Sequence, residues 1–353
     1  MKKFLKVLAG VVLSLSVVFT VAVYLSTFHP DPIESVVVYG DDNAPTLKAG
    51  QSVTILSWNV QFMAGNNNNH FFYADGPDPW PNANTVAMVT RRVADFIAAQ
   101  DPDVVMLQEV DDKAARTHMQ DQTELLRKYL PQYSAYTETF YWKAAYVPIP
   151  AINGRVGMKL LVLSKYKLSE ATRYALSAIT SDDVLTRQFN LKRAMLQVHM
   201  PVDDGSELIL IDTHLSAFAQ GSNTMEVQVG QVMDRLAALP ENARWVLGGD
   251  FNLLPNEAAL ASHAELRSSY NEQGTELYPL ISRYPSVPRL AAIEANPEPS
   301  YTYMSPQDPL RQPDRTIDYI FHSPRLAITR GEVLRGEAKP LSDHLPIIVE
   351  LIL

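Results

Sequence analysis

The hydrophobic and polar positions of the chain show one pattern twice. Residues 52–58 form a short apolar run that ends at Asn59. A helix is predicted over residues 84–100, because its apolar positions recur at helical spacing. A second apolar run, residues 104–107, leads to Glu109. This first unit therefore predicts a strand, a polar side chain, a helix, a second strand and an acid.

A second unit repeats this order further along the chain. Its parts are a strand over residues 208–212, His214, a helix over residues 224–239, a strand over residues 245–247, and then Asp250 and Asn252. Two such units can pack sheet against sheet with their helices outside, which predicts a layered α/β sandwich. Polar residues just past the strands would then meet at one rim, where open α/β folds place ligands.

The N-terminus carries the pattern of a membrane signal. Residues 1–6 are basic, and residues 7–25 form a run of 19 residues without a charge, about 28 Å long as a helix. No small-residue cleavage site follows, so we expect an uncleaved signal anchor. The preceding lysines place the rest of the chain outside the inner membrane, in the periplasm. A cleaved signal peptide with a secreted product, and a buried core helix, are the alternatives.

Three segments follow from these patterns. Residues 1–28 are expected to be the transmembrane anchor. Residues 29–50 are rich in Pro, Asp and Gly and are expected to be a stalk. Residues 51–353 contain no low-complexity linker, so we expect one catalytic domain there.

Composition and charge exclude several classes of site and partner. The chain has no cysteine, which excludes disulfides, thiolate catalysis, Cys-ligated zinc and iron–sulfur clusters. The first 30 residues hold three lysines and no acid, so 27 basic and 39 acidic residues remain and give the body a net charge of −12. Such an acidic body without a Lys/Arg cluster is unlike a non-specific nucleic-acid binder, although a bound cation would invert the local field.

Six short segments carry a family resemblance. They are SWNVQ (57–61), LQEV (107–110), DTHL (212–215), GGDFN (248–252), TIDYI (316–320) and SDHLP (342–346). In this order they resemble the endonuclease/exonuclease/phosphatase superfamily, which includes deoxyribonucleases, abasic-site endonucleases, inositol polyphosphate 5-phosphatases and neutral sphingomyelinases. The resemblance implies a four-layer α/β sandwich and a metal-dependent hydrolase of phosphoester bonds.

The resemblance also implies a metal site. Glu109 would be the ligand of Mg²⁺, with Mn²⁺ as the other possible metal. Asn59 would bind the ion through its carbonyl oxygen or orient Glu109, and Asp343 would face the same metal or a second one. Oxygen ligands of this kind suit hard divalent cations. The alternatives are a solvated acid, a turn-forming asparagine and a structural acid, respectively.

The first catalytic residues implied by the resemblance lie at the end of the second unit. Asp250 would orient or deprotonate the attacking water, and Asn252 would hold a phosphoryl oxygen. Gly248 and Gly249 would let the backbone turn sharply before them. The alternative is an Asx turn without a catalytic role.

Two histidines complete the implied machinery. His344 would act as general base or as electrostatic partner of the phosphate, with Asp318 fixing its tautomer. Whether His344 or Asp250 removes the proton stays open. His214 would donate to a phosphoryl oxygen or protonate the leaving group, with Asp212 in support; a core histidine is its alternative.

Residues that bind the substrate are less well defined by the sequence. Lys159 lies in a strand that resembles the family and would contact a phosphate, or else be a solvated strand residue. Arg193 is expected to pair with a carboxylate beneath the site. Aromatic residues in segments 63–81 and 140–150, including Trp80 and Trp142, would rim the site and stack on bases, enter a lipid interface or form a satellite core.

The function expected from the sequence is that of a membrane-anchored, Mg²⁺-dependent phosphodiesterase or phosphatase, with a lipid head group or a small phosphodiester as the favoured substrate. A soluble phosphate ester or nucleotide is a further possible substrate. An extracytoplasmic nuclease acting on nucleic acid is the main alternative. A non-catalytic binding module is disfavoured because every motif residue is intact. No protein partner is predicted.

Overall fold

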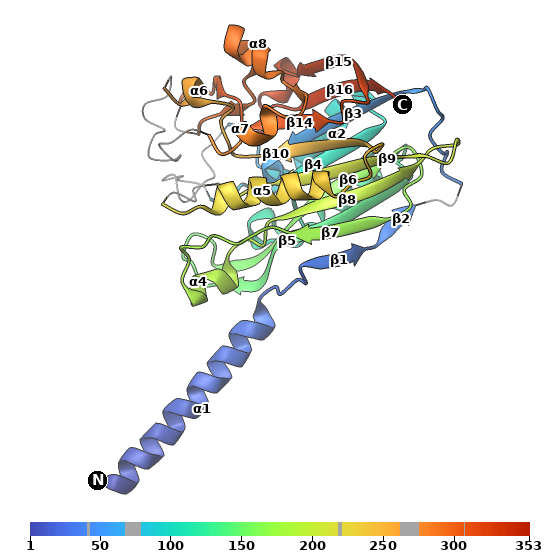
Figure 1. The fold of residues 1–353 in the computed structure, drawn as a ribbon. Helices are drawn as coiled ribbons and strands as arrows, with labels where there is room; N and C mark the ends of the chain where they lie inside the picture. The colour runs from blue at the N-terminus through green and yellow to red at the C-terminus, as the bar shows by residue number, and fades with distance from the viewer. Residues whose placement is uncertain (41–42, 68–78, 218–220, 262–274, 307) are drawn as a thin grey trace.

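Two mixed β-sheets pack face to face in the computed structural model of the protein, which describes residues 1–40, 43–67, 79–217, 221–261, 275–306 and 308–353 (Figure 1). Sheet A has the order β15–β16–β3–β4–β6–β5–β2 and consists of β2 (Val38–Gly40), β3 (Ser52–Asn59), β4 (Val104–Asp111), β5 (Ala135–Val147), β6 (Gly154–Ser164), β15 (Ala327–Val333) and β16 (Ile347–Ile352). Sheet B has the order β1–β7–β8–β9–β10–β14–β11 and consists of β1 (Ile33–Val36), β7 (Ala171–Ala175), β8 (Ala194–Pro201), β9 (Glu207–His214), β10 (Arg244–Asp250), β11 (Ser286–Val287) and β14 (Asp318–His322). A small separate pair consists of β12 (Tyr303–Met304) and β13 (Pro313–Arg315).

Helices cover the outer faces of both sheets. The helices are α1 (Lys2–Ser26), α2 (Ala83–Gln100), α3 (Gln122–Tyr129), α4 (Val184–Phe189), α5 (Thr224–Ala237), α6 (Glu257–Ala261), α7 (Tyr278–Ile281) and α8 (Leu290–Ala295). Apolar residues of α2 and α3 pack on sheet A, and those of α5 pack on sheet B. A third apolar core fills the space between the sheets. These four layers confirm the sandwich that the family resemblance implied.

The ends of α2 show how the local sequence sets an element. The Asn82 side chain accepts a hydrogen bond from the Asn84 amide and caps the first turn. At the other end Asp101 adopts the left-handed conformation, and Pro102 cannot continue the helix. The predicted helix over residues 84–100 is therefore confirmed within one residue.

The two predicted units are also present as expected. Strands β3 and β4, joined through α2, are parallel neighbours in sheet A, and β9 and β10, joined through α5, are parallel neighbours in sheet B. Parallel strands end at the same edge of their sheet. The polar residues at the ends of these four strands therefore come together where the two sheets meet.

The segment expected to be a stalk differs from that expectation. Strand β1 pairs with β7 at one edge of sheet B, and β2 pairs with β5 at one edge of sheet A. Leu47 is fully buried in the core between the sheets. The β-branched run at residues 36–38 favours extended edge strands despite the Pro, Asp and Gly around it. Residues 33–40 and Leu47 thus belong to the folded domain.

Helix α1 has the length and hydropathy of a membrane-spanning helix, and none of its residues is buried. A signal sequence has the same properties. The helix ends beside sheet A, where Thr27 forms a β-bridge with Ala144 of β5.

Candidate active site

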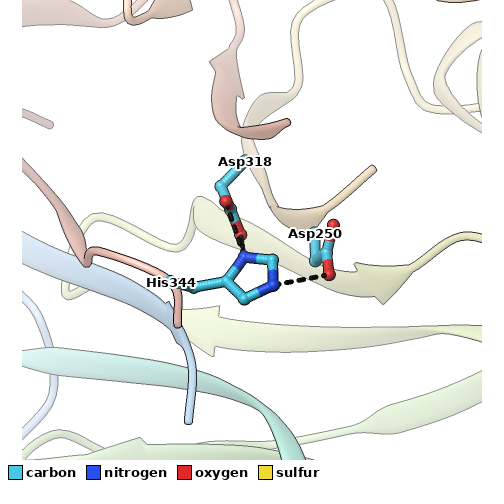
Figure 2. Close-up of side chains that lie close together, drawn as sticks. All are labelled: Asp250, Asp318 and His344. Carbon is cyan, nitrogen blue, oxygen red and sulfur yellow. Dashed lines mark hydrogen bonds and ion pairs between the residues drawn. The ribbon is translucent and has the colours of Figure 1, made fainter. Parts of the chain in front are cut away.

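A buried histidine–aspartate pair lies at the centre of the site (Figure 2). The two carboxylate oxygens of Asp318 are 3.0 and 2.9 Å from His344 Nδ1. An ionised carboxylate only accepts, so Nδ1 carries the proton in this pair. His344 Nε2 then faces Asp250, 3.6 Å from its Oδ2. The pair bridges the sheets, because Asp318 begins β14 of sheet B and His344 lies just before β16 of sheet A.

Asp250 is the point where the other polar side chains converge. Its Oδ2 accepts a hydrogen bond of 2.9 Å from Asn59 Nδ2 and lies 3.2 Å from His214 Nε2. Asp250 and His214 are paired residues at the ends of β10 and β9, and Asn59 ends β3 of the other sheet. The five side chains of Asn59, His214, Asp250, Asp318 and His344, called the Asp250 cluster below, therefore come from both predicted units and from the last two motifs.

The two glycines before Asp250 do not form the expected sharp turn. Both lie within β10. A Cβ atom at Gly249, whose φ is 146°, would lie 1.9 Å from the carbonyl oxygen of Thr213 in β9. A Cβ atom at Gly248 would lie 2.4 Å from Met106 Cε of sheet A. Glycine is therefore needed because strands and sheets approach closely behind Asp250.

Asn252 holds the second oxygen of Asp250. It adopts the left-handed conformation, with φ of 53°, which asparagine tolerates better than most residues. Its backbone amide donates to Asp250 Oδ1 at 2.9 Å, and its side-chain Nδ2 donates to the Leu215 carbonyl at 3.2 Å. This backbone bond fixes the Asp250 carboxylate beside the cluster.

Glu109 and Asp343 fit a divalent cation. Glu109 lies at a β-bulge of β4 with φ of 60°, and its Oε1 accepts a hydrogen bond of 3.2 Å from Asn59 Nδ2. Asp343 is buried, and its Oδ2 has no hydrogen-bond partner among the described residues. Burial raises the pKa of Asp343 to about 7, with His344 opposing this shift and Glu109 adding to it. A buried carboxylate oxygen left unpaired, on which the charge of Glu109 also acts, suits a divalent cation, which would neutralise charge on a bound phosphate.

The amide of Asn59 takes the orienting role of the two that were expected. Its Oδ1 accepts from the Gln61 backbone amide at 3.0 Å, so its nitrogen faces Glu109 and Asp250. Asp250, Asp318 and His344 also bring ligand atoms within 4.8 Å of one another. His344 Nδ1 and both Asp318 oxygens are already joined by hydrogen bonds, whereas His344 Nε2 faces Asp250.

Burial and charge act in opposite directions on His344. Burial alone would lower the pKa of His344, but the charges of Asp318, Asp250 and Asp343 raise it well above its usual value. Burial also raises the pKa of Asp250 to about 7, against the effect of His344. Near neutral pH, His344 is therefore an imidazolium and lies beside Asp250, whose carboxyl group gains or loses a proton in the same pH range. Such a pair is suited to proton transfer.

Tyr141 has a role that the sequence did not reveal, because it was expected among the rim aromatics. It is fully buried in β5, and its hydroxyl lies 3.2 Å from His214 Nδ1. Burial, together with the positive charges of Arg193 and His344, lowers the pKa of His214 well below its usual value. The Tyr141 hydroxyl also lies 2.6 Å from Met158 Sδ, so it contacts both the sulfur and the imidazole. Because His214 Nε2 faces the Asp250 carboxylate, a neutral His214 that donates from Nε2 leaves Nδ1 facing the Tyr141 hydroxyl.

Two arginines, Arg193 and Arg116, carry charges that act on Tyr141. The Arg193 guanidinium lies over the Tyr141 ring, 5.2 Å from its centroid. The expected carboxylate partner of Arg193 is not found within the described ranges, and its buried Nη1 makes no hydrogen bond to them. Arg116 instead binds Asp111 through two hydrogen bonds of 2.9 Å and lies over the Phe62 ring.

Lys159 does not join the Asp250 cluster. Its ammonium group is buried and lies 2.7 Å from Glu138, 3.5 Å from Asp112 and 3.8 Å from Asp121. Three acids thus compensate its charge inside sheet A, so the side chain is neither solvated nor placed to meet a phosphate.

The structure describes only some of the aromatic residues that were expected to rim the site. Most of segment 140–150 lies in β5, where Trp142 Nε1 donates to the Phe189 carbonyl of α4 at 2.7 Å. Trp80 Nε1 donates to the Ala151 carbonyl at 3.1 Å. The remaining aromatics of the first segment, Phe71, Phe72 and Tyr73, lie outside the described residues. Trp142 and Glu109 line the same cavity, which has a volume of about 560 Å³.

Solved structures with this fold come from several kinds of organism. An endonuclease/exonuclease/phosphatase from Beutenbergia cavernae is 20% identical, with a TM-score of 0.58 over 86% of this chain and 72% of that one. The human nocturnin catalytic domain is 20% identical, with a TM-score of 0.54 over 90% and 97%. A mannosyl-6-phosphatase of Bacteroides thetaiotaomicron is 18% identical, with a TM-score of 0.51 over 85% and 100%. At these identities the likeness shows the fold alone.

The family itself is shown by sequence. No curated protein sequence matches the chain. The sequence profile of the Endonuclease/Exonuclease/phosphatase family, however, matches residues 56–344. This range includes all the side chains of the Asp250 cluster. The chain therefore belongs to the endonuclease/exonuclease/phosphatase family, whose members are hydrolases of phosphoester bonds.

Proposed function

We propose that the protein is a membrane-anchored, Mg²⁺-dependent phosphodiesterase that hydrolyses a lipid head-group ester or another small phosphodiester. The observation that carries this proposal is the convergence of two histidines, two aspartates and an asparagine in the buried Asp250 cluster. Phosphodiester hydrolysis needs an oriented water, stabilised phosphoryl charge and a proton for the leaving group. The cluster offers a group for each task.

The geometry supports one assignment of these tasks. Asp250 orients the attacking water and accepts its proton, because its pKa of about 7 is suited to that transfer. His344, held as an imidazolium by Asp318, faces the developing charge on the phosphoryl oxygens. His214, neutral and beside Tyr141, donates a hydrogen bond from Nε2 to a phosphoryl oxygen, and the imidazolium of His344 is the group that can give the leaving oxygen a proton. Glu109 and Asp343 would hold the metal.

Two observations favour a lipid or small substrate over nucleic acid. The apolar helix α1 would tether the domain to a membrane surface. Outside the first 30 residues the chain carries a net charge of −12, which opposes binding along a phosphate backbone. The tether is tested by a carbonate wash of membranes that contain the full-length protein. The anchor requires the protein to stay in the pellet, whereas release would favour a cleaved signal.

The activity is tested with residues 31–353, Mg²⁺ and two substrates in parallel. The substrates are vesicles of phosphatidylcholine and sphingomyelin, and plasmid DNA. We expect release of a phosphorylated head group, and a loss of about 10²- to 10⁴-fold in kcat in His344→Ala. The matched control is His199→Ala, because His199 is half-buried in β8 outside the cluster. Nicking of DNA that is lost in His344→Ala would instead make the protein a nuclease. Failure on both substrates would exclude the lipid head group and favour a small soluble phosphoester.

A further inference from the structure

The cavity beside the Asp250 cluster is larger and more apolar than a phosphate group requires. It has a volume of about 560 Å³, within the range of small-molecule sites. The turn between β5 and β6, helix α4 and the residues after β9 form its walls. Its apolar lining includes Trp142, Val147, Ile152, Met158, Leu185 and Phe189. Most side chains of the wall are apolar, so the cavity suits a hydrocarbon better than a nucleobase.

Two charged groups in the wall, Arg155 and Arg193, each have a buried nitrogen without a hydrogen-bond partner in the described parts of the chain. Arg116, which lines the cavity, is neutralised by Asp111. Arg193 also lines the cavity, is only 8% exposed, and its Nη1 makes no hydrogen bond within the described parts of the chain. A buried guanidinium nitrogen without an acceptor is costly. Because Arg193 lies next to Tyr141, which contacts His214, an anion between Arg193 and the Asp250 cluster would supply the missing acceptor.

The apolar part of the cavity lies at the end of the domain where α1 emerges. Figure 1 shows α4 and the C-terminal end of α1 at the same end of the domain. Strand β5 connects the two features, since Ala144 bridges to Thr27 and Trp142 lines the cavity. Two lining residues, Ile149 and Leu185, are 43% and 49% exposed. Exposed apolar side chains beside a membrane-type helix favour contact with lipid.

We infer that this cavity binds a hydrocarbon chain of the substrate, while the phosphate lies between Arg193 and the Asp250 cluster. The inference rests on the proposed function and narrows it to an ester with an alkyl or acyl chain, supplied from a membrane. Each methylene group that enters the cavity should then raise affinity about three- to four-fold. Chain length, rather than the head group, becomes the main determinant of KM.

The test compares two esters that differ only in chain length. Residues 31–353 with Mg²⁺ are assayed on methyl 4-nitrophenyl phosphate and on dodecyl 4-nitrophenyl phosphate, the latter below its micelle concentration. We expect KM to be at least tenfold lower for the dodecyl ester. Leu185→Glu should raise KM for the dodecyl ester about tenfold more than it raises KM for the methyl ester. Val184→Glu is the matched control, because Val184 precedes Leu185 on α4, is 77% exposed and does not line the cavity.

The outcomes separate this inference from the proposed function. Equal KM values for the two esters, or an equal effect of Leu185→Glu on both, would overturn the cavity assignment while hydrolysis itself still supports the phosphodiesterase. If neither ester is hydrolysed, the phosphodiesterase proposal fails, and binding decides about the cavity. Calorimetry should then show dodecyl phosphate binding at least tenfold more tightly than inorganic phosphate, with the difference lost in Leu185→Glu. Equal binding of the two would refute the cavity assignment as well.

Discussion

At the scale of single residues, the carboxylate of Asp318 decides the charge of His344. The pair is buried, and burial alone would favour a neutral imidazole. Asp318 reverses that preference through its hydrogen bonds to Nδ1 and its charge. The folded protein therefore keeps His344 protonated at pH values where the unfolded chain loses the proton. The stabilisation from this charge is complete below the usual histidine pKa and is lost as pH rises through the raised value.

Asp318→Asn should lower the pKa of His344, because the amide accepts from Nδ1 without carrying charge. We expect kcat to fall about 10²-fold or more, and the alkaline limb of the pH–rate profile to move to lower pH. The acid limb, set by Asp250 with its pKa of about 7, should persist. Titration of the His344 ring followed by NMR is the direct measurement. An unchanged ring pKa in the variant would contradict the role given to Asp318.

Asp212 illustrates a buried acid whose role is structural. It lies between the sheets and accepts a 2.6 Å hydrogen bond from Gln108 Nε2. Burial raises the pKa of Asp212 well above its usual value. Above the pKa of the unfolded chain, ionisation of Asp212 favours unfolding, so this group lowers stability as pH rises from there through its folded pKa.

Asp212→Asn should therefore be at least as stable as the parent at pH 7, because the amide keeps the acceptor and cannot ionise. Asp212→Ala removes the partner of Gln108 and should cost about 1–3 kcal/mol. Urea denaturation of both variants at pH 5 and pH 8 measures these effects. A destabilised Asn variant at pH 8 would show that the ionised carboxylate, not the protonated one, belongs to the fold.

At the scale of elements, the sequence predicts strands and helices from the spacing of their apolar residues. It does not predict contacts between segments that are far apart along the chain. The strands that end at Asn59 and Asp250 were visible because apolar runs stop at polar residues. The contact between Tyr141 and His214 was not, because β5 approaches β9 only through the packing of two sheets. The cavity was hidden for the same reason, since its walls come from separate stretches of chain. The sequence predicts a sharp turn at Gly249, whereas the structure needs glycine there because β9 lies close beside β10. The sequence does not show which strand lies beside β10.

Two glycine substitutions in sheet B and its covering helix should have opposite effects on stability. Gly249→Ala forces a Cβ atom against the Thr213 carbonyl at a left-handed φ, so we expect a loss of at least about 3 kcal/mol. Gly230→Ala, in the interior of α5 with no atom within 4 Å, should gain about 0.5–1 kcal/mol from helix propensity. Thermal unfolding of the two variants compares them directly. Equal stabilities would contradict the close approach of β9 and β10.

At the scale of the whole molecule, the segment that follows α1 adds an edge strand to each of the two sheets. Strand β1 covers the edge at β7, and β2 covers the edge at β5. The buried Arg173 guanidinium depends on this segment, since it donates to the Asp31 carbonyl at 3.4 Å and lies 3.7 Å from Glu34. The tether is thus continuous with the fold. Its composition suggested a stalk because four residues of a strand carry too short a pattern to stand out among Pro, Asp and Gly.

Replacement of residues 33–40 by a Gly/Ser segment of equal length, within residues 31–353, separates these two views. A stalk tolerates the change, whereas the loss of two edge strands should lower the denaturation midpoint and expose the edges of β5 and β7 to intermolecular pairing. We expect higher-order species in size-exclusion chromatography and a loss of several kcal/mol in unfolding free energy. Glu34→Gln is the milder control, because it keeps both strands and removes only the charge that faces Arg173. An unchanged midpoint in the Gly/Ser protein would return this segment to the role of a linker.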